Sequence, residues 1–268
     1  MTDLAKIHHL VLDMDGTLYL GRSLFPQTLP FLALIERLGI GRSFVTNNCS
    51  RSRAEYVEHL SAMGIETRPE DVWTSAHATI HYLRTHLPSA NRLFVLGAAG
   101  LKDEFRLAHF EIVEEQPQAV VVGFDQELTY DDLAQTAYWI KQDLPFVATH
   151  PDRVCPTERP IVLPDCGALC ALFESATGRR PLAVPGKPDP MMMQAVLERY
   201  GLAPHEVAMV GDRIYTDMRM ARAVGAMGVL TLTGEATLAD IEACPPAERP
   251  DLVVATLEEF GRLLEVAR

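Results

Sequence analysis

Polar side chains recur where short β-type runs end and, at Lys187, in a Gly-Lys-Pro loop before a predicted helix. The set comprises Asp13, Asp15, Thr46, Asn47, Lys187 and Asp212. Carboxylate oxygens are the ligands that Mg²⁺ prefers, whereas a lysine amine, a threonine hydroxyl and loop amides can hold phosphoryl oxygens. Carboxylates that face one crevice beside a lysine would therefore form a magnesium site next to a phosphate site. An aspartate on such a scaffold could attack phosphorus directly.

Each of these residues also has an ordinary structural explanation. A single aspartate at a strand end is more often a turn residue or a helix cap, and Lys187 before a proline could be a solvated loop residue. Thr46 and Asn47 could form a turn, and Asp217 could be a charge in the first turn of the following helix. Their occurrence in order, each after a β-type run, favours the functional interpretation.

The elements that would position these side chains alternate between strands and helices. Runs rich in β-branched residues and leucine predict strands at residues 9–14, 43–46, 93–96, 119–123, 207–210, 228–232 and 252–255. Apolar spacing predicts helices at residues 28–38, 101–108, 130–141, 190–200, 214–224 and 257–266. This alternation predicts an α/β fold with a mostly parallel sheet covered on both faces. Ligands bind such sheets beyond the carboxyl ends of the strands, where the polar set lies.

The composition is that of an ordinary globular chain and argues against several classes of function. Of the 268 residues, 48% are apolar, and 24 basic against 36 acidic side chains leave a net charge of −12. Such a charge disfavours a nucleic acid partner. The five cysteines form no CxxC pair, which argues against a disulfide framework or a thiolate zinc site. Because the chain has no long uncharged apolar stretch, we expect a cytoplasmic protein without a signal peptide or membrane span.

Proline-containing stretches near residue 88 and at residues 181–188 mark candidate domain boundaries. The segment between them has its own pattern of strands and helices, and no internal repeat or low-complexity segment is visible. We therefore interpret this segment as an inserted domain.

Four segments together resemble the haloacid dehalogenase superfamily of phosphohydrolases. They read DMDGTLY at residues 13–19, TNN at 46–48, GKP at 186–188 and GDRIYTD at 211–217. The TNN segment, with THPD at residues 149–152 and PTE at 156–158, is similar to the subgroup typified by NagD and p-nitrophenyl phosphatase-type enzymes. The resemblance implies a Rossmann-like parallel-sheet core at residues 1–80 and 183–268, with an inserted α/β cap domain at residues 81–182.

Carried over by position, the resemblance implies roles for the core residues. Asp13 would be the nucleophile that takes the phosphoryl group as an aspartyl phosphate, and Asp15 would be the general acid and base. Thr46, Asn47 and Lys187 would bind the transferring group, whose charge spreads over its equatorial oxygens.

The resemblance also implies a Mg²⁺ cofactor. The ion would be held by Asp13, the Asp15 carbonyl and Asp212, with Asp217 in its outer coordination sphere. Its charge would offset the repulsion between the anionic nucleophile and the anionic phosphate.

Two motifs of the cap depart from the usual pattern of the subgroup. Where the subgroup has Thr-Asn-Pro-Asp, this chain has His150 in place of the asparagine, and where it commonly has Pro-Gly-Asn-Gly, this chain reads PDCG at residues 164–167. The core groups address the phosphate that every substrate shares, so discrimination must come from elsewhere. We expect His150, Asp152 and Arg153 in the cap to contact the rest of the substrate.

The expected activity is Mg²⁺-dependent hydrolysis of small soluble phosphomonoesters, of the nucleotide monophosphate, p-nitrophenyl phosphate, phosphoglycolate or sugar phosphate type. The expected partner is a small phosphorylated metabolite, with no nucleic acid polymer and no membrane, and we also consider a homodimer through the cap. Two alternatives stay open: a phosphomutase or phosphotransferase of the same fold, and a non-catalytic phospholigand-binding regulatory protein. Dehalogenation is disfavoured by Asp15, because that reaction needs no second acid there.

Overall fold

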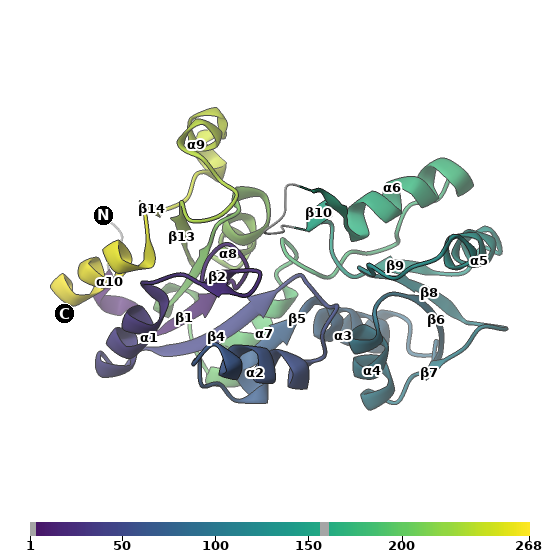
Figure 1. The fold of residues 1–268 in the computed structure, drawn as a ribbon, viewed down its shortest axis with the longest axis horizontal. Coiled ribbons are helices and arrows are strands. Elements are labelled where there is room, and N and C mark those ends of the chain that lie inside the picture. Colours follow the sequence, from purple (N-terminus) through teal and green to yellow (C-terminus); the bar gives the residue numbers. More distant parts are fainter. Residues whose placement is uncertain (1–3, 156–160) are drawn as a thin grey trace. The chain divides into compact units, whose positions relative to one another are not determined.

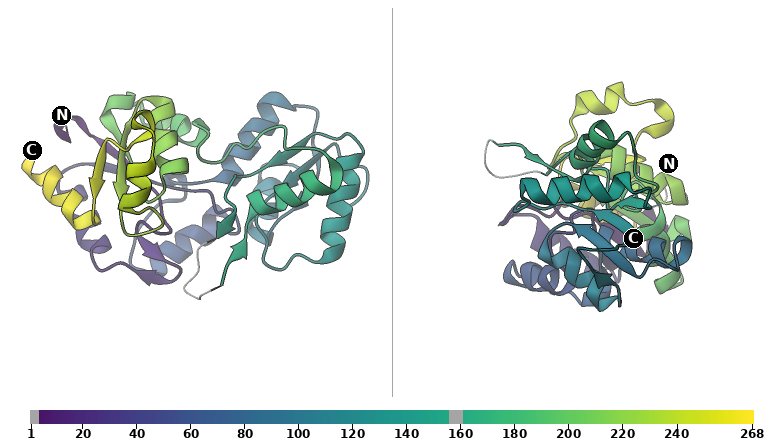
Figure 2. Two further views of the ribbon diagram at one scale, coloured as in Figure 1. Left: turned by 90° about the horizontal axis from the view of Figure 1, so that it is seen from above. Right: turned by 90° about the vertical axis from the view of Figure 1, so that its right-hand side faces the viewer.

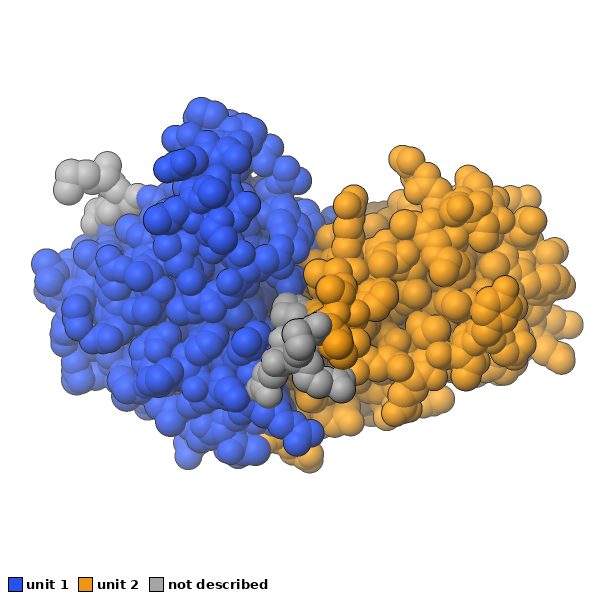
Figure 3. Space-filling view, turned by 45° about the horizontal axis from the view of Figure 1, so that its top comes forward, with its two compact units in different colours: residues 1–46, 59–73, 187–268 blue, residues 47–58, 74–186 orange. Residues whose placement is uncertain are grey.

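The computed structural model describes residues 4–155 and 161–268 and divides into two compact units (Figures 1 and 3). Unit 1 comprises Met1–Thr46, His59–Trp73 and Lys187–Arg268, and unit 2 comprises Asn47–Glu58 and Thr74–Gly186. The domain boundaries at residues 80/81 and 182/183 stay a prediction, since the division by packing falls at other positions. Two of its crossing points, after residue 46 and before residue 187, adjoin residues of the predicted phosphate site.

Unit 1 is built on a six-stranded sheet in the order β14-β13-β12-β1-β4-β5. The strands are β1 His9–Leu12, β4 Gly41–Thr46, β5 Val72–Thr74, β12 Val207–Gly211, β13 Met227–Thr231 and β14 Leu252–Val254. The pairs from β14 to β4 are parallel, with Leu12 opposite both Phe44 and Val210. Every residue of β1, β12 and β13 is buried, as expected for strands covered on both faces. The predicted parallel-sheet α/β fold is confirmed.

The helices of unit 1 follow the apolar spacing of the sequence. They are α1 Thr28–Arg37, α7 Met191–Tyr200, α8 Arg219–Val224, α9 Leu238–Ala243 and α10 Leu257–Val266, and α2 Arg53–Ala62 runs across the division between the units. Short turns occur at Leu4–Lys6, Pro69–Asp71, Pro204–Glu206 and Pro246–Glu248, and β2 Tyr19–Leu20 pairs with β3 Ser23–Leu24. Helices α1 and α10 pack together, with the rings of Phe31 and Phe260 5.9 Å apart.

The segment between β12 and α8 differs from its prediction. We expected one helix over residues 214–224, but Ile214–Met218 forms a π-helical turn and only Arg219–Val224 is α-helical. The Met218 amide accordingly donates to the Arg213 carbonyl, five residues back. In this wider turn the Asp217 carboxylate folds back and accepts a hydrogen bond from the Arg213 amide at 3.1 Å. Such single π turns are frequent at functional sites.

Unit 2 contains a four-stranded parallel sheet in the order β7-β6-β8-β9. Its elements are β6 Arg92–Leu96, β7 Glu111–Ile112, β8 Ala119–Val122, β9 Phe146–Ala148, α3 Ser75–His86, α4 Ala99–Leu107, α5 Tyr130–Lys141 and α6 Cys166–Thr177. Alternate side chains of β6 point to opposite faces. Leu93 and Val95 pack with α3 and α4, whereas Phe94 and Leu96 pack with α5 and α6, so one pair of helices covers each face (Figures 1 and 2).

A small antiparallel hairpin of β10 Val154–Cys155 and β11 Leu163–Pro164 precedes α6. Helix α6 begins after Asp165, whose carboxylate accepts a hydrogen bond from the Cys166 amide. It ends at Gly178, whose backbone adopts the left-handed conformation. The PTE segment at residues 156–158 lies outside the described residues. Within the described ranges, no helix is both long enough and apolar enough to cross a bilayer.

Candidate active site

The carboxyl edge of the unit 1 sheet brings Asp13 and Asp212 together. Asp13 follows β1 and Asp212 follows β12, and these two strands are parallel neighbours. The Asp13 amide continues the strand ladder, donating to the Val210 carbonyl at 2.9 Å. Both side chains are buried, at 6% and 3% exposure. A parallel sheet thus places two carboxylates at its ligand-binding edge, as the sequence predicted.

Lys187 supplies the positive charge of this cluster. Its ammonium group is ion-paired with the Asp13 carboxylate and lies 2.7 Å from Oδ1 of Asp217. Burial disfavours the charged ammonium, but the attraction of Asp13 and Asp217 outweighs burial and raises the pKa of Lys187 well above its ordinary value. Lys187 therefore stays cationic in the interior of unit 1 and joins two of the predicted site residues.

The acidic groups of the cluster are too many for one lysine. Oxygens of Asp13, Asp212 and Asp217 all lie within 4.8 Å of one another. Burial, together with the neighbouring carboxylates, raises the pKa of Asp212 to about 8 and that of Asp217 to about 6. Oδ1 of Asp212 is buried and has no hydrogen-bond partner among the residues that the structure describes. An unpaired buried oxygen within a set of repelling carboxylates is the donor set expected of a divalent cation site.

Neighbouring groups hold these carboxylates in place. Thr17 donates to Oδ2 of Asp13 at 3.2 Å, and the Glu235 amide donates to Oδ2 of Asp212 at 2.7 Å. A Cβ atom at Gly16 or Gly234 would lie 2.5 or 2.0 Å from that same Asp212 oxygen, so only glycine allows the backbone to approach so closely. Thr17 and the turn around Gly234 were given no role from the sequence. The sequence signal that could have indicated them is a small residue just after a predicted strand and its polar motif.

Asp15 and Thr46 lie at the same edge with different exposure. Asp15 is half-buried, more open than Asp13, and its Oδ1 accepts a hydrogen bond from the Gly21 amide at 3.3 Å. Thr46 ends β4, the other neighbour of β1, and is 4% exposed. A carboxyl group that is more open than Asp13 suits proton exchange with water or with a bound ligand.

The remaining predicted residues belong to unit 2. The side-chain Nδ2 of Asn47 donates to Oδ1 of Asp152 at 3.1 Å, and the main-chain carbonyl of Asn47 accepts a hydrogen bond from the Ser75 hydroxyl at 2.6 Å. His150 is fully buried and Asp152 is 4% exposed, whereas Arg153 is exposed. Of the three residues expected to contact the substrate from the cap, Arg153 alone presents its side chain to solvent.

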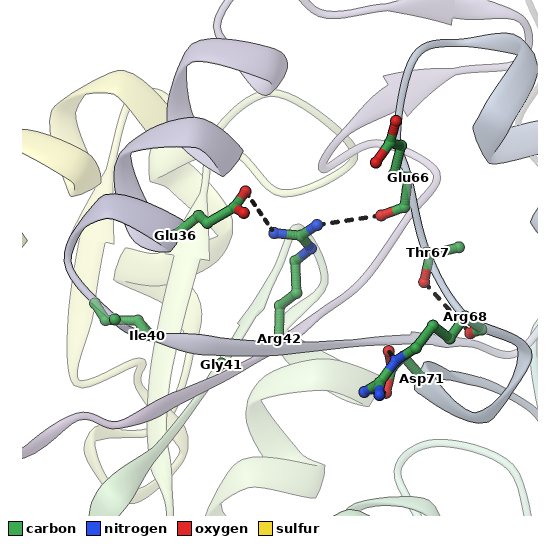
Figure 4. Close-up of a pocket in the computed structure, with 9 residues that line it drawn as sticks. Glu36, Ile40, Gly41, Arg42, Glu66, Thr67, Arg68 and Asp71 are labelled. Carbon is green, nitrogen blue, oxygen red and sulfur yellow. Dashed lines mark hydrogen bonds and ion pairs between the residues drawn. The ribbon is translucent and has the colours of Figure 1, made fainter.

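The surface of unit 1 also has a pocket of about 590 Å³ at the amino end of β4 (Figure 4). Both of its arginines are already paired: Arg42 lies between the Glu36 carboxylate at 3.9 Å and the Glu66 main-chain carbonyl at 3.1 Å, and Arg68 pairs with Asp71 at 2.9 Å. Ligands of parallel sheets bind at the opposite, carboxyl edge. This pocket is therefore not the candidate active site.

Known proteins share this fold over nearly the whole chain. Residues 10–111 match the family described as haloacid dehalogenase-like hydrolase, and residues 184–260 match a family described as HAD-hydrolase-like. An acid sugar phosphatase of Staphylococcus aureus is 35% identical over 87% of this chain and 89% of its own length.

Solved structures extend this similarity. The 4-nitrophenylphosphatase of Thermotoga maritima superposes with a TM-score of 0.91 at 37% identity, over 98% of this chain and 99% of its own. A glycerol phosphate phosphatase of Mycobacterium tuberculosis, solved in complex with magnesium, superposes with a TM-score of 0.88 at 32% identity, over 98% of this chain and 80% of its own. The chain belongs to the haloacid dehalogenase-like hydrolase family, among the NagD and p-nitrophenyl phosphatase-type phosphatases, as its motifs indicated.

Proposed function

We propose that the protein is a Mg²⁺-dependent phosphatase that hydrolyses small phosphomonoesters through an aspartyl phosphate on Asp13. The observation that carries this proposal is the buried cluster in which Lys187 pairs with Asp13 and Asp217 beside the partly unsatisfied Asp212. A nucleophile, a cation that can neutralise phosphoryl oxygens and a cation-binding carboxylate set are thereby combined at one sheet edge.

In the first half-reaction the Asp13 carboxylate attacks phosphorus. The new bond joins an Asp13 oxygen to phosphorus while the bond from phosphorus to the leaving oxygen breaks. Asp15 transfers its proton to that leaving oxygen, so that an alcohol departs. Lys187 and the Thr46 hydroxyl bind the equatorial oxygens, and Asn47 would complete this set. Thr17, which holds Oδ2 of Asp13 at 3.2 Å, restricts the rotation of the carboxylate.

In the second half-reaction water attacks the phosphorus of the aspartyl phosphate. Asp15, now a carboxylate, accepts the proton that the water loses. The bond between phosphorus and the Asp13 oxygen breaks, which releases inorganic phosphate and restores both carboxyl groups to their starting states. One residue thus acts first as an acid and then as a base, which explains the need for two carboxyl groups in the DMD segment.

The donor set fits a divalent cation, and the magnesium complex of the M. tuberculosis relative supports Mg²⁺. Asp13, the Asp15 carbonyl and Asp212 would hold the ion. When bound, it supplies positive charge that offsets the repulsion between the attacking carboxylate and the phosphate. Asp217 contacts both Lys187 and the Arg213 amide, so its part is to orient the lysine and to lie behind the metal ligands.

The substrate we propose is a small phosphorylated metabolite, of the sugar phosphate, glycerol phosphate or aryl phosphate type. The names of the relatives support this class, and Arg153, being exposed, is our candidate for a contact with the leaving group. We retain as proposals a cap domain at residues 81–182 that covers the site and a homodimer through this cap. We also propose a cytoplasmic location, which the five free thiols support.

The test is a panel of phosphomonoesters assayed with the purified protein, with and without Mg²⁺. Inorganic phosphate and the dephosphorylated alcohol should form in equal amounts, and only when the metal is present. A phosphorylated second product would instead identify a mutase or phosphotransferase. Binding of phosphorylated ligands without turnover would indicate a regulatory protein. The Asp13→Asn variant is the negative control, since it keeps the shape of the side chain but lacks the nucleophilic carboxylate.

A further inference from the structure

His150 lies in the interior of unit 2, beside two points at which the chain passes between the units. Its side chain has no exposed surface. A Cβ atom at Gly186 would lie 2.8 Å from both the His150 Cβ and the Asn47 Oδ1, so these three residues are in close contact. Asn47 follows Thr46 and Gly186 precedes Lys187, both of which we assign to phosphate binding. His150 is thus placed to influence the phosphate site without reaching the substrate.

Both ring nitrogens of His150 have partners within unit 2. Nε2 lies 2.8 Å from Oδ1 of Asp165, which is itself buried and also accepts the Cys166 amide at the start of α6. Nδ1 lies 2.8 Å from the Thr149 hydroxyl and 3.5 Å from the Ser75 hydroxyl. The histidine therefore connects helix α6 with the first residue of helix α3.

The protons of these hydroxyls are directed elsewhere. The Ser75 hydroxyl donates to the Asn47 carbonyl at 2.6 Å, and the Thr149 hydroxyl donates toward the Cys166 sulfur at 3.8 Å. A hydroxyl has one proton to donate, so a hydrogen on Nδ1 of His150 would complete its contacts with both hydroxyl oxygens. Nε2 faces a carboxylate, which favours a second hydrogen on the ring. Burial alone would lower the pKa of His150, but the Asp165 carboxylate raises it well above its ordinary value.

We propose that His150 is a positioning residue of the phosphate site: as an imidazolium paired with Asp165, it anchors Ser75 and through it the main chain at Asn47. The inference rests on the proposed role of Asn47 in phosphate binding. It also explains the two departures from the subgroup's usual motifs together, because His150 replaces the asparagine of one motif, Asp165 replaces a glycine of the other, and these two residues are bonded to each other. Each substitution would leave a lone buried charge without the other.

This proposal gives His150 a role in phosphate binding in place of the contact with the rest of the substrate that we expected from the sequence. A buried residue that acts through Asn47 affects the binding of the phosphate, which all substrates share. Its loss should therefore raise KM for every phosphomonoester by the same factor and leave kcat nearly unchanged, because the phosphate is bound in both ground and transition states. Substrate selectivity should stay constant.

The kinetic test compares His150→Asn, Asp165→Asn and the double variant on p-nitrophenyl phosphate and a hexose phosphate. Each single variant should raise KM for both substrates by roughly tenfold, with kcat within about threefold of wild type. The double variant should have a KM between that of the single variants and that of wild type, because no unpaired charge remains while the anchor at Ser75 is still missing. His9→Asn is the matched control: His9 is also buried and bonded to a hydroxyl, Ser43 Oγ at 2.9 Å, but at the amino end of β1. It should reduce stability and leave KM unchanged.

Proton-detected NMR of ¹⁵N-labelled histidine rings in the wild-type protein tests the charge state without relying on a variant's fold. His150 should show two protonated ring nitrogens at pH 7.5, whereas His9, whose pKa burial lowers to about 4, should show one. A single protonated nitrogen at His150 would overturn the proposal. So would single variants with unchanged KM, a double variant no better than the singles, or a divalent ion bound by His150, Asp152 and Asp165. Failure of the wild-type protein to hydrolyse any phosphomonoester would refute the proposed function instead, and the NMR result would still stand.

Discussion

Replacing Asp212 by asparagine should make the metal-free protein more stable while abolishing its response to Mg²⁺. In the metal-free cluster Asp212 is the group whose ionisation is opposed most strongly, by burial first and then by the charges of Asp13 and Asp217. Asparagine removes that charge, and its side-chain oxygen can still accept the Glu235 amide that Asp212 Oδ2 accepts at 2.7 Å. Higher stability without metal, together with a lost response to Mg²⁺, is the result expected if the role of Asp212 is to bind the ion.

The magnitude follows from the pKa of Asp212, which is raised from 3.8 to about 8 in the folded protein. For an acid whose pKa is higher in the folded state, stability is lost as the pH rises from about 4 toward 8. At about 1.4 kcal/mol per pKa unit, ionised Asp212 lowers the stability of the metal-free protein at pH 8 by on the order of 5 kcal/mol. Even half of this free energy corresponds to a rise in Tm of roughly 5–10 °C for the asparagine variant.

The assay is thermal unfolding in EDTA and in Mg²⁺, at pH 5 and pH 8. The variant should exceed wild type by more at pH 8 than at pH 5, since Asp212 is protonated in the folded protein at the lower pH. Mg²⁺ at a hundred times its Kd should stabilise wild type by about 2.7 kcal/mol and the variant by much less. Asp251→Asn is the matched control. The Asp251 carboxylate also accepts a hydrogen bond from a backbone amide, that of Gly228 at 2.8 Å, but Asp251 is exposed and lies outside the cluster. A variant less stable than wild type in EDTA at pH 8, or an equal response to Mg²⁺, would refute the reasoning.

Three further outcomes follow from the proposed chemistry. Asp13→Asn should abolish turnover while leaving the unfolding transition intact, and activity within about tenfold of wild type would exclude Asp13 as the nucleophile. EDTA should remove activity, Mg²⁺ should restore it and Ca²⁺ should inhibit, because Ca²⁺ accepts more ligands at longer distances and can occupy both Asp13 oxygens; full activity in chelator would contradict a metal-dependent mechanism. Arg153→Ala should change the ratio of kcat/KM between p-nitrophenyl phosphate and a hexose phosphate by roughly tenfold, about 1.4 kcal/mol, and an unchanged ratio would remove Arg153 from substrate recognition.

The helices that could be predicted from the sequence are those with local signals. The predictions at residues 130–141 and 257–266 coincide with α5 and α10, because each follows a threonine that caps the helix and repeats apolar residues at helical spacing. The sequence around His77 indicated a helix but not its bounds, since the cap of α3 pairs Thr74 with His77 in place of the usual acid. Helix α6 is apolar on most of its surface, so its period is hard to distinguish from that of a buried strand.

The site residues that could be predicted are likewise those with a local sequence signal, whereas contacts that form only in the tertiary structure could not be predicted. Asp13, Lys187 and Asp212 could be found because each sits beside a strand end or a helix start, and parallel topology brings such positions to one edge. The pairing of His150 with Asp165 could not be found, because the two residues come together only when α6 packs on the sheet of unit 2. The sequence indicated a cap loop in which His150 contacts the substrate, whereas its side chain is fully buried and its Nε2 lies 2.8 Å from Oδ1 of Asp165.

The most direct test of the phosphatase mechanism is rapid-quench mass spectrometry of the protein after mixing with substrate and Mg²⁺. Acid quenching within the first turnover should trap one phosphoryl group per chain, and fragmentation should locate it on Asp13. The signal should be absent from Asp13→Asn. With p-nitrophenyl phosphate, whose leaving group can depart without a proton, it should accumulate in Asp15→Asn, because the carboxylate that deprotonates the attacking water is missing there. A phosphoryl group on another residue, or hydrolysis in wild type with no trapped intermediate while Asp15→Asn also accumulates none, would contradict the aspartyl-phosphate mechanism.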